Sequence, residues 1–215
     1  MTLKLHFHPL SSFCWKALIA LYENDTPFEP VMVDFGDAAS RSAFLALWPI
    51  GKMPVLSDGA RDWMVPESSI IIEYLAQHYP GASPLVPADA DRARRVRMMD
   101  RFFDNYVHHP MQKIVGDRLR PQDGKDPFGV AEARAMLAKA YDMVESDRGE
   151  KTWAMGDEFT LADCSAAPAL YYGNRVAPFG ATHLKTAAYL KRLMARPSFA
   201  RVLKEAEPYQ AMFPA

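Results

Sequence analysis

The sequence has few cysteines, no long apolar run and almost no net charge. Its two cysteines, Cys14 and Cys164, are too few for a disulfide framework and do not have the spacing of metal ligands. No apolar stretch reaches the length of a membrane span, and the first ten residues lack the pattern of a secretory signal. We therefore expect a reduced, cytoplasmic protein with no metal and no membrane partner.

Charge argues against a nucleic-acid partner. The 25 basic and 26 acidic residues give a formal net charge of -1, so the chain as a whole does not attract phosphate backbones. A local basic run is the exception (Arg92, Arg94, Arg95 and Arg97). Acidic residues such as Asp91 interrupt this run, which is more typical of a solvated helix face than of a nucleic-acid site.

The spacing of hydrophobic residues changes along the chain between the alternation of a strand and the spacing of a helix. In the first eighty residues, alternating runs predict strands at 3–7, 28–33, 54–56 and 63–65, and helical spacing predicts helices at 12–23, 39–47 and 67–79. This order predicts a right-handed crossover that joins the first two strands in parallel. The last two strands should form an antiparallel hairpin across Asp58-Gly59.

Beyond residue 80 the pattern is helical. A broad apolar stripe covers 98–107, and further helices are expected at 130–144, 161–176, 184–194 and 199–206. Pro110, Pro121 and Pro127 are interpreted as breaks between helices. The segment that joins the two halves is rich in proline and reads as a linker. We therefore predict an α/β domain at 1–80, a linker at 81–90 and an all-helical domain at 91–215.

The first candidate for chemistry is the turn from the first strand into the first helix. A helix that starts there directs its unpaired N–H groups and the positive end of its dipole toward an anion, such as a thiolate. The hydroxyl of Ser11 or Ser12 could donate a hydrogen bond to that thiolate and favour its ionised form. The alternative is that either serine is only an N-cap.

Two further segments have polar groups suited to a peptide. Pro54 opens a strand after Gly51, and a cis bond before it would turn the backbone of Met53 outward, where Lys52 could also meet a carboxylate. At the start of the third helix, Glu67 could accept an ammonium group while Ser68 holds a carboxylate. A solvated lysine and a simple helix cap are the alternatives.

These segments together resemble the glutathione transferases, in particular bacterial-type members with a serine at the lead active-site position. The resemblance rests on Ser-Ser-Phe-Cys at 11–14, Lys-Met-Pro-Val-Leu at 52–56 and Pro-Glu-Ser-Ser-Ile at 66–70, in this order along the chain. The segment Phe159–Asp163 also resembles the family's capping box, in which Thr160 and Asp163 satisfy each other's backbone donors.

The resemblance implies a fold and a set of binding residues. The first domain would be thioredoxin-like with a cis Pro54, and the second a helical bundle. Glutathione, as cosubstrate, would pair with the backbone of Met53, with Lys52 nearby, and its γ-glutamyl end would bind Glu67 and Ser68. The thiolate would be stabilised by Ser11, with Ser12 as the second candidate. Because serine occupies the lead position, disulfide exchange through a cysteine pair is not expected. Cys14 lies one turn into the helix beside Phe13 and Trp15, and it is interpreted as a small buried residue.

The implied activity is transfer of glutathione to a small-molecule electrophile, as in detoxification, by a homodimer. Glutathione-dependent isomerisation, dehalogenation or ether cleavage, and a non-catalytic binding or regulatory role, are the alternatives. Tyr106, Met111 and Tyr172 are candidates for the electrophile pocket. His108 and His109 are interpreted as surface residues near a helix break at Pro110, because adjacent histidines on a helix face different ways.

Overall fold

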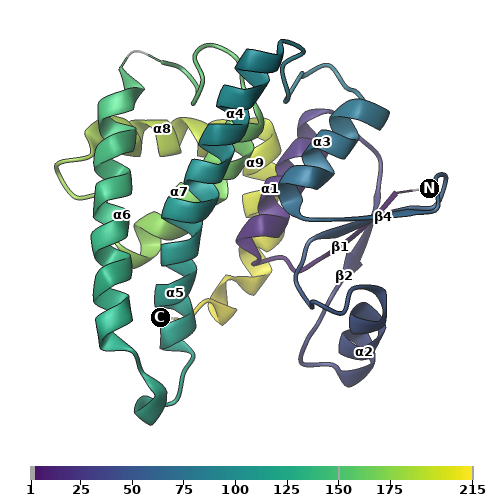
Figure 1. Cartoon of the computed structure of the whole chain (residues 1–215). Coiled ribbons are helices and arrows are strands. Elements are labelled where there is room, and N and C mark those ends of the chain that lie inside the picture. Colours follow the sequence, from purple (N-terminus) through teal and green to yellow (C-terminus); the bar gives the residue numbers. More distant parts are fainter. Residues whose placement is uncertain (1–2, 150, 215) are drawn as a thin grey trace.

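The computed structural model describes residues 3–149 and 151–214, which form a small mixed sheet with three helices followed by a larger helical part (Figure 1). The strands are β1 (Leu3–Phe7), β2 (Glu29–Met32), β3 (Val55–Asp58) and β4 (Trp63–Pro66). The helices of the first part are α1 (Ser12–Glu23), α2 (Ala38–Leu47) and α3 (Ser68–His78). The second part contains α4 (Ala90–Phe102), the π-helical η1 (Phe103–His108), α5 (His109–Arg118), the short η2 (Gln122–Gly124), α6 (Pro127–Arg148), α7 (Leu161–Val176), α8 (Leu184–Ala195), α9 (Pro197–Ala206) and the 3₁₀-helical η3 (Glu207–Met212).

The sheet has the topology that the sequence predicts. Its strand order is β2-β1-β3-β4, with β1 and β2 parallel and the other neighbours antiparallel. Pro30 lies in β2, and its lack of an N–H group is tolerated because β2 is an edge strand. The predicted hairpin is confirmed, with residues 59–62 connecting β3 to β4.

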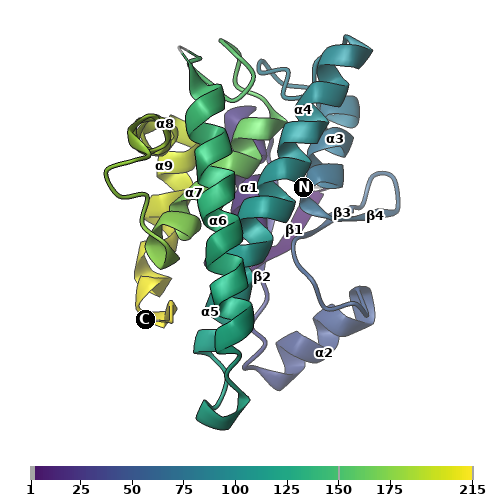
Figure 2. The ribbon, with the colours of Figure 1, turned by 60° about the vertical axis from the view of Figure 1, so that its left-hand side comes forward.

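Apolar side chains on both faces of the sheet explain how the parts pack. Helices α1 and α3 lie between the sheet and the helical part, and α1 contacts both α7 and α9 (Figures 1 and 2). Their buried side chains belong to one continuous core that extends through α7. Helix α2 covers a smaller cluster on the other side, formed by Phe44, Val33 and Val55. The fold is therefore a thioredoxin-like sheet domain joined to a helical domain.

Helix α5 and the burial of His108 differ from the sequence prediction. Pro110 does not break the chain's helical path, because it lies in the first turn of α5, where a missing N–H group costs little. In η1 the hydrogen bonds are of the π type, and the His109 N–H donates to the carbonyl of Asp104, five residues earlier. This wider turn changes which side chains face inward. His108 is fully buried, so its interpretation as a surface residue is wrong, while His109 is exposed.

The start of α7 is fixed as the sequence predicts. The Thr160 N–H donates to Asp163 Oδ2 at 2.9 Å, and the second Asp163 oxygen accepts the Ala154 N–H at 2.7 Å. Both residues are buried, so the first bond satisfies a donor at the start of α7 and the second satisfies a donor in the preceding loop. The capping box is confirmed as a structural element.

The basic run on α4 is an exposed helix face. Arg92, Arg94 and Arg97 pair with Glu158, Asp91 and Glu73, respectively. These ion pairs reduce the local positive charge that the run would otherwise present. Among residues 3–149 and 151–214, none of the helices has the length and apolar character needed to cross a bilayer.

The domain division of the sequence stays a prediction. Helix α3 ends at His78 and α4 begins at Ala90, and the intervening residues contain neither helix nor strand. This is where the linker at 81–90 is predicted. Residues 1, 2 and 215, which the ranges 1–80 and 91–215 include, lie outside the described residues.

Candidate active site

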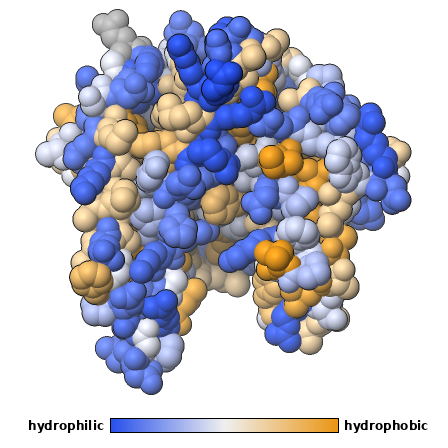
Figure 3. All heavy atoms as spheres, in the orientation of Figure 1, coloured by the Kyte–Doolittle hydropathy of each residue, from blue (hydrophilic) through white to orange (hydrophobic). Residues whose placement is uncertain are grey.

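Two adjoining cavities lie between the sheet domain and helix α5. The first has a volume of about 640 Å³ and the second about 430 Å³, and both are lined by Leu10, Ser11, Lys52 and Gln112. Figure 3 shows this face hollowed between the lobe that contains α2 and the lower ends of α5 and α6. Because four residues line both cavities, a molecule in one can touch a molecule in the other near Ser11.

Ser11 lies where the two cavities meet. It is the N-cap of α1, with extended backbone angles, and its Oγ accepts the Cys14 N–H at 3.4 Å. Ser11 therefore caps α1 and also lines both cavities. Ser12 is the first residue of α1, is only 5% exposed and lines the second cavity but not the first.

The peptide bond between Met53 and Pro54 is cis, as the resemblance implies. Met53 and Pro54 line the first cavity immediately before β3, opposite the Ser11 turn. Lys52 precedes them and is exposed at both cavities, so a carboxylate in the cleft could approach its ammonium group. This edge supplies both backbone groups and one positive charge.

The start of α3 completes the first cavity. Glu67 has a φ of 69°, an uncommon backbone conformation for a residue other than glycine, and its side chain caps no backbone N–H. A simple helix cap therefore does not explain this carboxylate, which is exposed at the cavity. Ser68 is the first residue of α3 and is 4% exposed. The N-termini of α1 and α3 thus open into one cavity, and both favour an anion.

A buried network of charged residues links these two helix starts. Lys16, one turn into α1, donates to Ser69 Oγ and to Asp104 Oδ2, both at 2.8 Å, and pairs with Asp100. Arg101 also contacts Ser69 and both aspartates. Lys16 is fully buried, so its charge is compensated by the two carboxylates of the helical domain. The sequence analysis did not identify this network, because its members are far apart in sequence.

Cys14 does not participate in the cleft. Its side chain is fully buried, and burial raises the pKa of its thiol to about 12. The interpretation of Cys14 as a buried apolar residue is confirmed. A thiol with this pKa remains protonated at neutral pH and is a poor nucleophile.

The second cavity contains two of the three predicted pocket residues. Met111 and Tyr172 line it. Tyr106, which lies in the π-helical η1, lines neither cavity; it is 47% exposed and its ring packs on Phe102. The structure therefore does not bring Tyr106 to the pocket.

Other cleft residues were missing from the sequence prediction. His109 and Gln112 reach the first cavity from α5, and Met212, Phe213 and Pro214 line the second. The only signal for the last group is the apolar character of the tail, which does not indicate its destination. Among the described residues, no group of three histidine, cysteine or acidic side chains is arranged to hold a metal ion.

Comparisons with known proteins agree with this architecture. The model of the glutathione S-transferase N-terminal domain matches residues 5–83, and the model of the C-terminal domain matches residues 107–197. Glutathione S-transferase 3 of Zea mays is 34% identical, over 94% of this chain and 93% of its own. A glutathione S-transferase of Silene vulgaris is 29% identical, over 94% of this chain and 97% of its own.

Solved structures give the same result. The apo form of glutathione S-transferase III has a TM-score of 0.77 and 30% identity, covering 100% of this chain and 98% of its own. A glutathione S-transferase from Methylobacterium radiotolerans, in complex with glutathione sulfonate, has a TM-score of 0.81 and 29% identity, covering 94% of each chain. The protein therefore belongs to the glutathione S-transferase family.

Proposed function

We propose that this protein ionises the thiol of glutathione and directs the thiolate at an electrophilic small molecule in the second cavity. The observation that carries the proposal is the position of Ser11, at the N-terminus of α1 and on the wall of both cavities. This hydroxyl can donate a hydrogen bond to a sulfur anion at the point where the cavities meet. The relatives above carry the same activity in their names.

The first cavity suits glutathione because its polar groups match those of the tripeptide. Glu67 would accept the γ-glutamyl ammonium, and Ser68 with its N–H would bind the neighbouring carboxylate at the N-terminus of α3. The backbone of Met53 would pair with the cysteinyl unit, and Lys52 would meet the remaining carboxylate. The structure solved with glutathione sulfonate supports this ligand.

Ser11 and the N-terminus of α1 can supply the stabilisation needed to ionise the glutathione thiol. Lowering a thiol pKa from about 8.5 by about two units requires about 2.7 kcal/mol of differential stabilisation. A hydrogen bond to a charged group contributes about 1.5–3 kcal/mol, and a helix N-terminus about 0.3–1 kcal/mol. Ser11 and the dipole of α1 are thus sufficient for the reaction as a serine-type transferase.

The same thiolate could serve isomerisation, dehalogenation or ether cleavage, since each begins with attack by glutathione sulfur. A disulfide-exchange role is disfavoured by the burial of Cys14. A non-catalytic binding role would leave glutathione affinity without turnover. The bacterial serine subtype and the cytoplasmic location remain part of this proposal; the two curated relatives described above are plant proteins.

Replacing Ser68 with alanine tests the glutathione site. We expect glutathione affinity to fall about 10- to 100-fold, since a hydrogen bond to a charged group contributes about 1.5–3 kcal/mol. Calorimetric titration of glutathione into the native protein and Ser68→Ala measures this change. Ser146→Ala, an exposed serine on α6, is the control and should keep native affinity. A native protein that fails to bind at millimolar glutathione would overturn the proposed function.

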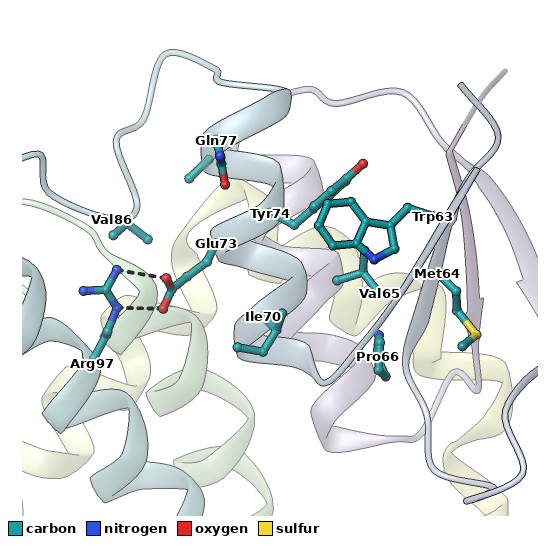
Figure 4. Close-up of a pocket in the computed structure, with 11 residues that line it drawn as sticks. Trp63, Met64, Val65, Pro66, Ile70, Glu73, Tyr74, Gln77, Val86 and Arg97 are labelled. Carbon is teal, nitrogen blue, oxygen red and sulfur yellow. Dashed lines mark hydrogen bonds and ion pairs between the residues drawn. The ribbon is translucent and has the colours of Figure 1, made fainter. Parts of the chain in front are cut away.

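We also propose that the protein is a homodimer, through an apolar groove on β4 and α3. Figure 4 shows Trp63 and Ile70 in this groove, with the Glu73–Arg97 ion pair at one side. Trp63 is 56% and Ile70 53% exposed, and both line this groove, so a partner that covered it would bury apolar surface. Met98 on α4 is similarly exposed, so a second copy could place its helical domain against this groove.

The dimer prediction can be tested by introducing a charge into the apolar groove. Trp63→Glu should convert a particle of twice the 24.2 kDa chain mass into a monomer, because burying a carboxylate without a partner is costly. Light scattering after size-exclusion chromatography measures the mass. The control is Leu184→Glu, which changes an exposed leucine on α8 and should leave the mass unaltered. A native protein that elutes as a monomer at micromolar concentration would refute the interface.

A further inference from the structure

The segment 207–214 crosses from α9 to the end of α5 and forms one wall of the second cavity. Figure 1 shows this segment passing below α7 and ending beside α5. Three consecutive residues, Met212, Phe213 and Pro214, line the cavity. The cavity is therefore bordered in part by a segment about one hundred residues away in sequence from Met111, which also lines it.

Side chains from α5 and α7 hold this wall in place. The Phe213 ring is stacked on Tyr172, with centroids 5.3 Å apart and planes 21° apart, and the Arg175 guanidinium lies 4.0 Å from the Phe213 centroid. Arg175 also donates to Gln210 Oε1, and Arg118 donates to the carbonyl of Pro214 at 3.1 Å. Stacking on one aromatic ring and a cation over the same ring are both attractive, so these contacts favour the observed position of Phe213.

The wall is connected to the catalytic turn through Tyr172. The Tyr172 hydroxyl donates to the carbonyl of Leu10 at 2.9 Å, and Leu10 immediately precedes Ser11. The same tyrosine ring supports Phe213. One side chain, Tyr172, therefore contacts both Phe213 and the residue that precedes Ser11.

The two ends of the second cavity differ in chemistry. Three polar residues, Ser11, Lys52 and Gln112, are shared with the first cavity, so they mark the end where the glutathione sulfur would lie, and Ser12 is next to Ser11 in the chain. The part that belongs to the second cavity alone is mainly apolar and includes Met111, Tyr172 and Phe213. An electrophile would therefore place its reacting carbon at the shared end and its apolar group toward Phe213.

We propose that Phe213 is a specificity-determining residue, and that the wall formed by 207–214 selects electrophiles that carry an aromatic group a few bonds from the reacting carbon. The inference rests on the proposed function, because it assumes that glutathione occupies the first cavity. An aromatic group of the substrate would pack against the Phe213 and Tyr172 rings, whereas a short aliphatic group would leave this contact unmade.

Two isothiocyanates test the proposal with the same chemistry. In each, the glutathione thiolate forms a bond to the central carbon, the C=N π pair moves to nitrogen, and nitrogen takes a proton from water to give a dithiocarbamate. No group leaves, so benzyl and allyl isothiocyanate differ only in the group that would face Phe213. The measurement is kcat/KM for both substrates, after subtraction of the uncatalysed rate.

We expect the native protein to prefer benzyl over allyl isothiocyanate, and Phe213→Ala to reduce this preference by roughly tenfold. Glutathione affinity by calorimetry should stay native in this variant. Phe128→Ala, an exposed aromatic on α6, is the control and should keep the native preference. Phe213→Leu keeps apolar bulk and should give an intermediate ratio if the alanine variant does not fold.

The possible results distinguish a failure of the proposed role of Phe213 from a failure of the proposed transferase function. An equal loss of rate with both substrates, or an unchanged ratio in both Phe213 variants, would overturn the role of Phe213 while glutathione binding and turnover still support the transferase. Absence of glutathione binding by the native protein would instead overturn the proposed function, and this inference with it.

Discussion

Replacing Ser11 with alanine should lower kcat by about 10- to 100-fold and leave glutathione affinity within about threefold of native, since the lost bond of about 1.5–3 kcal/mol is made to the thiolate. The backbone N–H groups of α1 and the polar groups at Glu67 and Ser68 remain in this variant, so the tripeptide should still bind. A lower kcat with retained glutathione binding would therefore indicate that the Ser11 hydroxyl promotes ionisation of the glutathione thiol.

The pH dependence gives a second readout of the same variant. In the native complex the thiol pKa should lie below its free value of about 8.5, and in Ser11→Ala it should move back toward that value. The rate at pH 6.5 should fall more than the rate at pH 9, because the thiol ionises unaided at high pH. The absorbance of the bound thiolate, titrated against pH, measures this pKa.

Ser12→Ala is the matched control for this prediction. Ser12 is buried at the second cavity and does not line the first, so its replacement should leave the thiolate pKa unchanged. The reverse result, with loss in Ser12→Ala and native behaviour in Ser11→Ala, would transfer the role to Ser12. That outcome would show that the turn rearranges when glutathione binds.

Replacing Lys16 with methionine should lower the free energy of unfolding by about 3–5 kcal/mol, because it leaves buried carboxylates without their main counter-charge. The methionine keeps the apolar stem but cannot pair with Asp100 or Asp104, nor donate to Ser69. Urea unfolding followed by fluorescence measures the change. Lys4→Met is the control, since Lys4 pairs with Glu29 at the surface, where such a pair contributes about 0–1 kcal/mol.

The acid sensitivity of the network follows from its pKa shifts. Burial alone would raise the pKa of Asp104, but the hydrogen bond with His108 and the charge of Lys16 hold it well below its usual range. A carboxyl group with a lowered pKa stabilises the fold above its unfolded pKa of about 3.9, and this contribution is lost as pH falls further. In Lys16→Met the pKa of Asp104 should rise. The decrease in the free energy of unfolding at acid pH should therefore be smaller than in the native protein.

His108 also makes the folded protein less stable as pH falls, but in a higher pH range than Asp104. Burial lowers the pKa of its imidazole, so the unfolded chain binds a proton more readily than the folded protein does. Stability should therefore decline as pH falls below about 6.5, the usual histidine value. An unfolding free energy that does not change between pH 7.5 and pH 5 would contradict this account of the network.

The residues proposed for the glutathione site could be selected from the sequence because each lies at a local transition in the chain. Ser11 follows the strand that ends before Pro9, Pro54 opens β3 after Gly51, and Glu67 follows the strand that ends at Pro66. Period changes, proline and the preferences of helix ends are visible within a few residues of sequence. The resemblance then placed these three turns in one cleft.

The electrophile pocket was less predictable because helical spacing alone does not fix which side chains face inward. The apolar stripe at 98–107 places Tyr106 with its neighbours, but the π-type bonds of η1 change the direction of the following side chains. Tyr106 consequently packs on Phe102 at the surface, while His108 is buried. Whether a segment adopts a π-helical turn depends on its packing against other helices, which the local spacing of apolar residues does not predict.

The sequence by itself determined the element order and topology of the sheet part, and the positions of the turns that carry Ser11, Pro54 and Glu67. These features depend on local backbone preferences and on the period of apolar residues. Only the tertiary structure decided that Lys16 joins Asp100 and Asp104, and that Phe213 meets Tyr172. Such contacts join residues far apart in the chain, and they form because buried charge requires a partner and apolar rings gain by excluding water.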